Sequence, residues 1–222
     1  MKHKYSLILL ILLCTAAVSV VDGIIMPGYA IKSASKLLLF GLVPLLYAKR
    51  TGIPLRGLFQ MQPRELKQAA LLGVTVFTLI LGGYFALRNA ADFSGITESL
   101  TTNAGVSREV FPIVAVYIPL VNALLEEFFF RGFAFLTLCH LFPKKFVYLF
   151  SSVVFALYHV SILQGWFSPA LYALAMTGLV VGGLLFNRLD SRSGSLLPSY
   201  FVHMSANLAI NTVGLILFGF IG

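Results

Sequence analysis

Long apolar runs, separated by short polar segments, occupy most of the chain. Each run is close to the roughly 20 residues that a helix needs to cross a bilayer. Backbone N–H and C=O groups in lipid must bond to one another, which helices and closed β-barrels allow. Barrel strands would alternate apolar and polar residues, and these runs show no such alternation, so we expect helices. The pattern predicts an all-α, polytopic transmembrane helix bundle of about seven spans, near residues 5–26, 29–48, 68–88, 111–138, 146–163, 169–187 and 196–220.

The amino-acid composition is also typical of a protein that is surrounded partly by lipid. Of the 222 residues, 59% are hydrophobic and 11% are charged, whereas soluble domains are about a quarter charged. Neither an internal repeat nor a low-complexity linker is visible, so we expect residues 1–222 to form a single membrane domain. The net charge of +8 lies in short clusters between apolar runs and not in any nucleic-acid-binding motif. The expected partner is therefore a lipid bilayer, with no nucleic acid.

The basic clusters predict an orientation. With seven spans they all fall on one side, which the positive-inside rule makes cytoplasmic. We therefore expect the N-terminus inside and the C-terminus outside, in a multi-pass protein of the cell membrane, specifically a bacterial inner membrane. The basic residues on the cytoplasmic side are Lys2, Lys4, Lys49, Arg50, Arg56, Arg64, Lys67, Lys144, Lys145, Arg188 and Arg192.

Two segments depart from the simple pattern. Lys32 and Lys36 interrupt the second run, and we expect their long side chains to snorkel to an interface. Residues 52–66, which contain Pro54 and Pro63, mix basic and apolar positions. This mixture predicts an irregular or amphipathic segment at the cytoplasmic surface.

The fourth run contains ionisable residues, in the sequence NALLEEFFFRGF. Such groups are costly inside a membrane and call for a functional or structural reason. Glu127 and Arg131 are four residues apart, so on a helix they can form an ion pair. Glu126 points about 100° away from Glu127 around the helix. We therefore expect Arg131 to neutralise Glu127 and Glu126 to have no ion-pair partner on this helix.

The fifth and seventh runs add two histidines. Phe155 and His159 are four residues apart, as are His203 and Asn207, so each pair shares a helix face. At the usual rise per residue, Glu126 and both histidines lie at similar depth, so we expect them to face one cavity. Polar contacts that merely join helices are the structural alternative.

This set of side chains suits hydrolysis of a peptide bond. Glu126 can take a proton from water, with His159 holding the water, while His203 and Asn207 can donate hydrogen bonds to an oxyanion. Water is the expected nucleophile, because the chain has no GxSG serine motif and no HExxH zinc motif. Asp22, Asp92 and Asp190 sit near span ends or in loops, so no pair of aspartates within spans is expected.

Three motifs resemble those of the CPBP family, also known as the Abi or CAAX-protease and bacteriocin-processing family. Glu126-Glu127-x-x-x-Arg131 resembles its EExxxR motif, Phe155-x-x-x-His159 its FxxxH motif, and His203-x-x-x-Asn207 its HxxxN motif. They occur in the family's order, each on a predicted span, within residues 110–212.

The resemblance implies a glutamic-type intramembrane endopeptidase with no cofactor and no metal. It implies that Glu126 and His159 activate the water, that His203 and Asn207 form the oxyanion site, and that Glu127, Arg131 and Phe155 are supporting residues. The expected substrate is a peptide or protein with a membrane-associated segment, such as an exported protein.

Other functions stay open at this stage. A non-enzymatic bacteriocin-immunity membrane protein would keep the motifs as inherited scaffold. A zinc-dependent membrane protease would use Glu126, His159 and His203 as ligands. A small transporter with a polar relay is the third alternative, although the repeat symmetry of many transporters is missing.

Overall fold

The structure is a computed structural model, and it describes residues 4–221. Seven helices within this range are long and apolar enough to cross a membrane, which confirms the all-α polytopic bundle. Their bounds are Lys4–Ile25, Tyr29–Thr51, Pro63–Leu87, Phe111–Leu136, Lys144–Ile162, Pro169–Ser193 and Leu197–Leu217.

Two predicted boundaries move because local signals extend the helices. The third span starts at Pro63, where Gln62 and Glu65 form a capping box ahead of the apolar run. The sixth span continues to Ser193 and ends at Gly194, whose φ of 71° is the left-handed conformation that favours glycine. Polar first and last turns therefore extend these helices beyond their apolar sections.

Several spans combine α-helix with π-helical turns, which are common at functional sites. Span one is α1 (Lys4–Val20) followed by η1 (Val21–Ile25). Span two is α2 (Tyr29–Lys36), η2 (Leu37–Leu42) and α3 (Val43–Thr51). Span four is α6 (Phe111–Tyr117), η4 (Ile118–Asn122), α7 (Ala123–Glu127) and η5 (Phe128–Leu136), and the remaining spans are α4 (Pro63–Leu87), α8 (Lys144–Ile162), α9 (Pro169–Ser193) and α10 (Leu197–Leu217).

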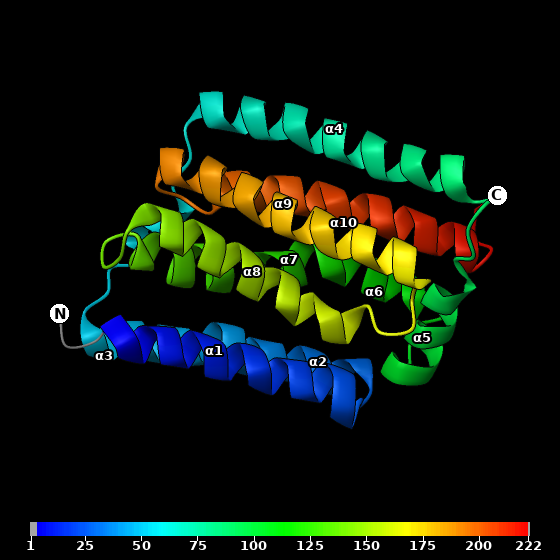
Figure 1. The fold of residues 1–222 in the computed structure, drawn as a ribbon, viewed down its shortest axis with the longest axis horizontal. Coiled ribbons are helices and arrows are strands. Elements are labelled where there is room, and N and C mark those ends of the chain that lie inside the picture. Colours follow the sequence, from blue (N-terminus) through cyan, green and yellow to red (C-terminus); the bar gives the residue numbers. More distant parts are fainter. Residues whose placement is uncertain (1–3, 222) are drawn as a thin grey trace.

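The connections are partly ordered into short helices. The segment predicted to be irregular at 52–66 contains a single 3₁₀ turn, η3 (Arg56–Phe59), before α4 begins. The long connection at 89–110 contains a further helix, α5 (Ser94–Ala104), which the apolar pattern did not predict. This helix packs against the end of α10 and lies at the C-terminal end of the bundle (Figure 1).

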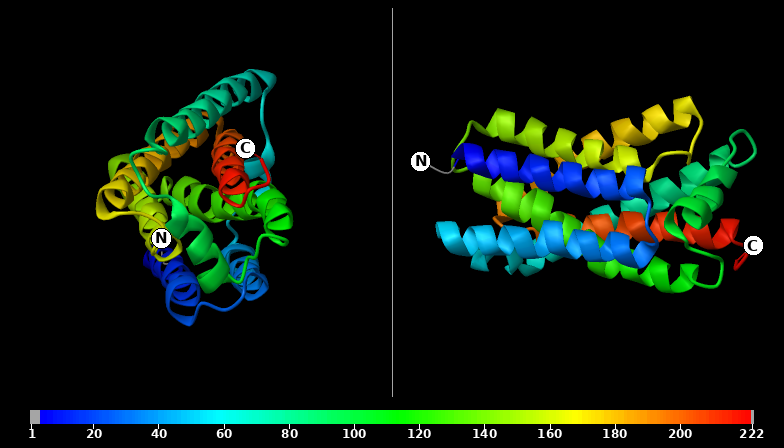
Figure 2. Two further views of the ribbon diagram at one scale, coloured as in Figure 1. Left: turned by 90° about the vertical axis from the view of Figure 1, so that its right-hand side faces the viewer. Right: turned by 90° about the horizontal axis from the view of Figure 1, so that it is seen from below.

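The spans run side by side, with the two ends of the chain at opposite ends of the bundle (Figure 1). The last residues of α3 and α9 and the first residues of α4 and α8 lie at the N-terminal end, so the basic clusters gather there as the topology requires. Figure 2 shows that α4 and the pair formed by α1 and α2 lie on opposite sides of the bundle. The chain is thus built as a multi-pass membrane protein.

An aromatic core joins spans two, four and five. Phe40 stacks on Phe129 at 4.2 Å between ring centroids, and edge-to-face contacts connect it to Phe130 and Tyr158. Phe129 and Phe130 are completely buried. Rings of this size remove much surface from lipid and hold η5 rigidly against α8, which fixes the helix that carries the glutamates.

Lys32 and Lys36 are the clearest correction to the sequence-based expectations. Instead of reaching an interface, Lys32 is buried and the Lys36 side chain is only 12% exposed. Both turn inward because Asp22, at the end of span one, supplies a buried partner for them. The second span therefore presents positive charge to the interior of the bundle.

Candidate active site

The two glutamates lie in the middle of span four, on the short α-helical segment α7 between two π-helical turns. Glu126 is 2% exposed and Glu127 is completely buried. Pro119 is the second residue of the preceding π turn, η4, and because proline has no backbone N–H, the hydrogen-bond ladder is already interrupted there. The sequence thus places two carboxylates side by side within the bundle.

Glu127 pairs with Arg131, as the spacing predicted. Its Oε1 lies 3.3 Å from Nη1 of Arg131, and both side chains are completely buried. The guanidinium also lies 4.0 Å from the ring centroid of Phe155 and 4.9 Å from that of Phe186, positions that favour cation–π attraction. Phe155 and Phe186 therefore both contact the guanidinium of this ion pair.

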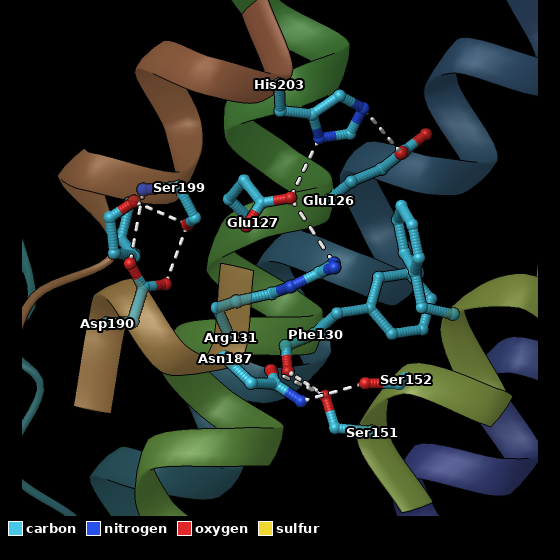
Figure 3. A network of polar contacts seen from close by, with 12 residues as sticks. Glu126, Glu127, Phe130, Arg131, Ser151, Ser152, Asn187, Asp190, Ser199 and His203 are labelled. Atoms are coloured by element: carbon cyan, nitrogen blue, oxygen red, sulfur yellow. Dashed lines mark hydrogen bonds and ion pairs between the residues drawn. The ribbon is translucent and has the colours of Figure 1, made fainter. Parts of the chain in front are cut away.

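Glu127 also has a second partner, which the sequence did not indicate. The imidazole of His203 donates from Nδ1 to the same Oε1, at 2.8 Å (Figure 3). One carboxylate oxygen thus joins a guanidinium on span four to an imidazole on span seven. Glu127 therefore orients His203 as well as neutralising Arg131.

Glu126 is held by one of its two oxygens. Its Oε1 accepts hydrogen bonds from Nδ2 of Asn122, at 2.6 Å, and from the hydroxyl of Tyr158, at 3.1 Å. Its Oε2 faces the Nε2 atoms of His159 and His203, each at 3.8 Å. The carboxylate is therefore anchored on one side and turned toward two imidazoles on the other.

His159 is oriented by its own helix. Its Nδ1 donates to the carbonyl oxygen of Phe155 at 2.8 Å, so the hydrogen of the neutral ring is on Nδ1 and Nε2 carries a lone pair. The ring packs on Phe155, with centroids 4.6 Å apart, as the four-residue spacing predicted. The 3.8 Å between Nε2 and Glu126 exceeds a direct hydrogen bond and suits a bridging water.

A single large cavity contains the predicted residues. It has a volume of about 740 Å³ and its walls are mainly apolar. Glu126, His159, His203 and Asn207 all line it, so the structure brings together the four residues singled out in the sequence. Most of its remaining walls come from α4, α5, α9 and α10.

The small residues of α9 divide between packing and cavity. Gly183 packs so closely on Ser152 of α8 that an added Cβ would lie 3.0 Å from it. Gly178 and Gly182 instead line the cavity, with open space where a side chain would project. Glycine thus both joins α9 to α8 and enlarges the cavity.

Sequence reasoning assigned no role to several residues around the site. Asn122 precedes Glu126 by four residues, a spacing that already allowed their hydrogen bond. No sequence signal indicated that Tyr158 reaches Glu126. Asp190 was placed near the end of a span, but it is completely buried and accepts hydrogen bonds from the backbone N–H and the hydroxyl of Ser199, at the start of α10 (Figure 3). Asp190 therefore fixes the helix that carries His203.

A zinc site would need several ligands close together. Within residues 4–221, no group of three or more His, Cys, Asp or Glu side chains is arranged to hold a metal ion. Oε2 of Glu126 lies 3.8 Å from Nε2 of His159 and 3.8 Å from Nε2 of His203.

Fold and site together define a polytopic helical membrane protein with a carboxylate and two imidazoles in a buried cavity. Residues 108–209 match the family described as type II CAAX prenyl endopeptidase Rce1-like. This match confirms the resemblance to the CPBP, or CAAX-protease, family over the segment that carries the three motifs, and the family is one of proteases. Comparison with curated proteins found no match, and comparison with solved structures found none either.

Proposed function

We propose that this chain is a glutamic-type intramembrane endopeptidase in which Glu126 and His159 activate a water molecule. The observation that carries the proposal is the arrangement of Glu126: Asn122 and Tyr158 anchor one oxygen, and the other faces two histidines in a large apolar cavity. A base held in one orientation, with its free oxygen toward the cavity, is what general-base catalysis needs.

The reaction follows from these positions. A water between Oε2 of Glu126 and Nε2 of His159 gives a proton to the carboxylate, and its oxygen bonds to the scissile carbonyl carbon. The carbonyl oxygen becomes an oxyanion in the tetrahedral intermediate. Glu126 then passes the proton to the amide nitrogen, the C–N bond breaks, and a carboxylic acid and an amine are released.

His203 and Asn207 supply the oxyanion site in this proposal. Because Glu127 accepts the hydrogen bond from Nδ1 of His203, the Nε2 atom is turned toward the cavity, and it donates to the oxyanion when the ring is protonated. Asn207 lines the same cavity one helical turn further along α10. Donors fixed in an apolar surrounding stabilise developing charge more strongly than water does.

The proposed substrate is a peptide or protein with a membrane-associated segment, cut in the cell membrane of a bacterium. The cavity supports this class because its walls are mainly apolar and it lies within the helices that cross the bilayer. An apolar peptide segment there exchanges lipid contacts for protein contacts.

Removing metal should leave the activity unchanged. The test uses the purified chain in liposomes and a pooled library of internally quenched, apolar decapeptides, assayed before and after treatment with EDTA and with 1,10-phenanthroline. We expect cleavage in all samples, at rates within about twofold, because glutamate and histidine alone activate the water. Activity that is lost with chelator and restored by zinc would establish a metalloprotease instead. A pool left uncut even at stoichiometric protein counts against an enzyme.

Removing the hydroxyl of Tyr158 should slow the reaction without weakening substrate binding. The Tyr158→Phe variant leaves Oε1 of Glu126 with one donor, so the carboxylate is less well oriented. We expect kcat to fall about tenfold, as for loss of a hydrogen bond to a charged group, with KM little changed. Tyr148→Phe on the same helix, which removes an exposed hydroxyl bonded to Ser191, is the matched control. A Tyr158→Phe protein as active as wild type would contradict the anchoring role.

A further inference from the structure

Two lysines of span two line the cavity that contains the candidate site. Lys32 and Lys36 are one helical turn apart, and both border the same space as Glu126. Neither lysine lies within residues 108–209, the segment that matches the protease family. Positive charge inside a membrane span is expensive to keep, and residues that carry it there usually have a function. The three motifs do not account for these two lysines.

The lysines share one carboxylate, that of Asp22 at the end of span one. Nζ of Lys36 lies 3.3 Å from Oδ2 of Asp22, and Nζ of Lys32 donates to the backbone oxygen of Asp22 at 3.1 Å. Asp22 itself is buried. Two ammonium groups beside one carboxylate leave this lysine cluster, which consists of Asp22, Lys32 and Lys36, with one surplus positive charge.

The surplus charge has a counterpart on the other side of one aromatic ring. The ammonium of Lys36 lies 5.4 Å from the ring centroid of Tyr158, within the range of cation–π attraction. The hydroxyl of the same ring donates to Oε1 of Glu126 at 3.1 Å. Glu127 already neutralises Arg131, so the carboxylate of Glu126 carries the negative charge that offsets the lysine cluster.

We propose that Lys36 is a positioning residue for the reaction, whose positive charge balances Glu126 and keeps it the carboxylate that accepts the proton of the water. This inference rests on the proposed function. A lone carboxylate in an apolar cavity tends to take up a proton and become neutral, and a neutral carboxylic acid cannot act as a base. A nearby fixed cation opposes this, because charges attract strongly where little water screens them.

Tyr158 and Asp22 each have a part in this arrangement. The ammonium over the ring of Tyr158 draws electron density from its hydroxyl, which makes that hydroxyl a better donor to Glu126. Asp22 holds Lys36 in place, and because it removes only one of the two lysine charges, the cluster offers the single charge that one carboxylate needs. The reacting atoms are then balanced in charge without a cation that touches the water or the peptide.

The test separates charge from structure. Lys36→Met removes the surplus charge and should lower kcat on the quenched peptide library about tenfold, because the base loses its balancing cation. KM should stay within about twofold, because the lysine acts on the base and not on the bound peptide. Lys36→Arg keeps the charge and should keep most of the activity. Lys49→Met, at an exposed lysine of the same span, is the matched control and should behave as wild type.

A second pair of variants changes the charge while leaving no carboxylate of the cluster unpaired. Asp22→Asn/Lys36→Met leaves only Lys32 charged, which restores the surplus of one, and should recover most of the kcat that Lys36→Met loses. Adding Lys32→Met brings the cluster to zero charge and should lower kcat again by about tenfold. This pair gives the answer even where Lys36→Met alone does not fold, because neither variant leaves Asp22 as a buried, unpartnered anion.

Three results would overturn the role of Lys36. The first is a Lys36→Met protein with the kcat of wild type. The second is a rise in KM with kcat unchanged, since the lysine would then contact the substrate. The third is equal kcat for the double and triple variants at equal thermal unfolding temperatures, since charge would then be irrelevant. Cleavage that persists in Glu126→Gln refutes the proposed base itself, whereas these three results leave Glu126 as a base that needs no lysine.

Discussion

Replacing Glu126 with glutamine is expected to reduce peptide cleavage by about a thousandfold or more, while the protein stays folded. The glutamine carbonyl still accepts hydrogen bonds from Asn122 and Tyr158, so the side chain keeps its position. Its amide nitrogen replaces the oxygen that faces His159, and an amide cannot take a proton from water. General-base catalysis typically contributes 10²–10⁴-fold, which sets the expected loss. The measurement is the initial rate on the quenched peptide library in liposomes.

The matched control is Glu98→Gln, which makes the same chemical change on an exposed residue of α5. Equal thermal unfolding temperatures of both variants and the wild type would show that the fold is intact. A Glu126→Gln protein that cleaves at the wild-type rate would eliminate the mechanism. If the protein conferred bacteriocin protection that survived this change together with His159→Ala, the non-enzymatic immunity hypothesis would be favoured.

Replacing Arg131 with methionine should have the largest effect on stability. The guanidinium is completely buried, and within residues 4–221 its nitrogens make no hydrogen bond of good geometry. Its compensation comes from Glu127 and from the rings of Phe155 and Phe186. Removing it leaves the imidazole of His203 as the one remaining close polar partner of Glu127 among the described residues. Breaking a buried pair in this way typically costs about 3–5 kcal/mol, so we expect unfolding to become easier by about 3 kcal/mol.

This prediction is measured by the free energy of unfolding in detergent micelles. Arg192→Met, an exposed position on α9, is the control and should change stability little. The double variant Glu127→Gln/Arg131→Met removes both charges and should recover part of the loss, because no unpaired carboxylate is left buried. If Arg131→Met were as stable as wild type, the ion pair would be irrelevant to the fold.

The spans and their order were predictable because each depends on the transfer of a contiguous segment into lipid. Helix ends moved where polar caps extended a span, as at Gln62 and Glu65. The extra helix α5 was missed because its sequence, SGITESLTTNA, has little apolar periodicity and is ordered by packing on α10. Local sequence therefore predicts the membrane-spanning helices better than it predicts the short helices in the connections between them.

The candidate site was predicted in part. The pairing of Glu127 with Arg131 follows from helical spacing alone, and the structure confirms it. The convergence of Glu126, His159 and His203 on one cavity also agrees with the depth argument. The anchoring of Glu126 by Tyr158 did not follow, because it joins side chains 32 positions apart on different spans.

The sequence by itself determined the membrane-spanning architecture, the buried ion pair of span four and the residues that match the protease family. These features could be predicted because helical spacing and transfer into lipid each depend on one segment of the chain, without its neighbours in the fold. Only the tertiary structure decided that Glu127 also binds His203, that Tyr158 holds Glu126, and that Lys32 and Lys36 turn inward to Asp22. These contacts depend on which helices are neighbours and how each is rotated, and packing between helices sets both.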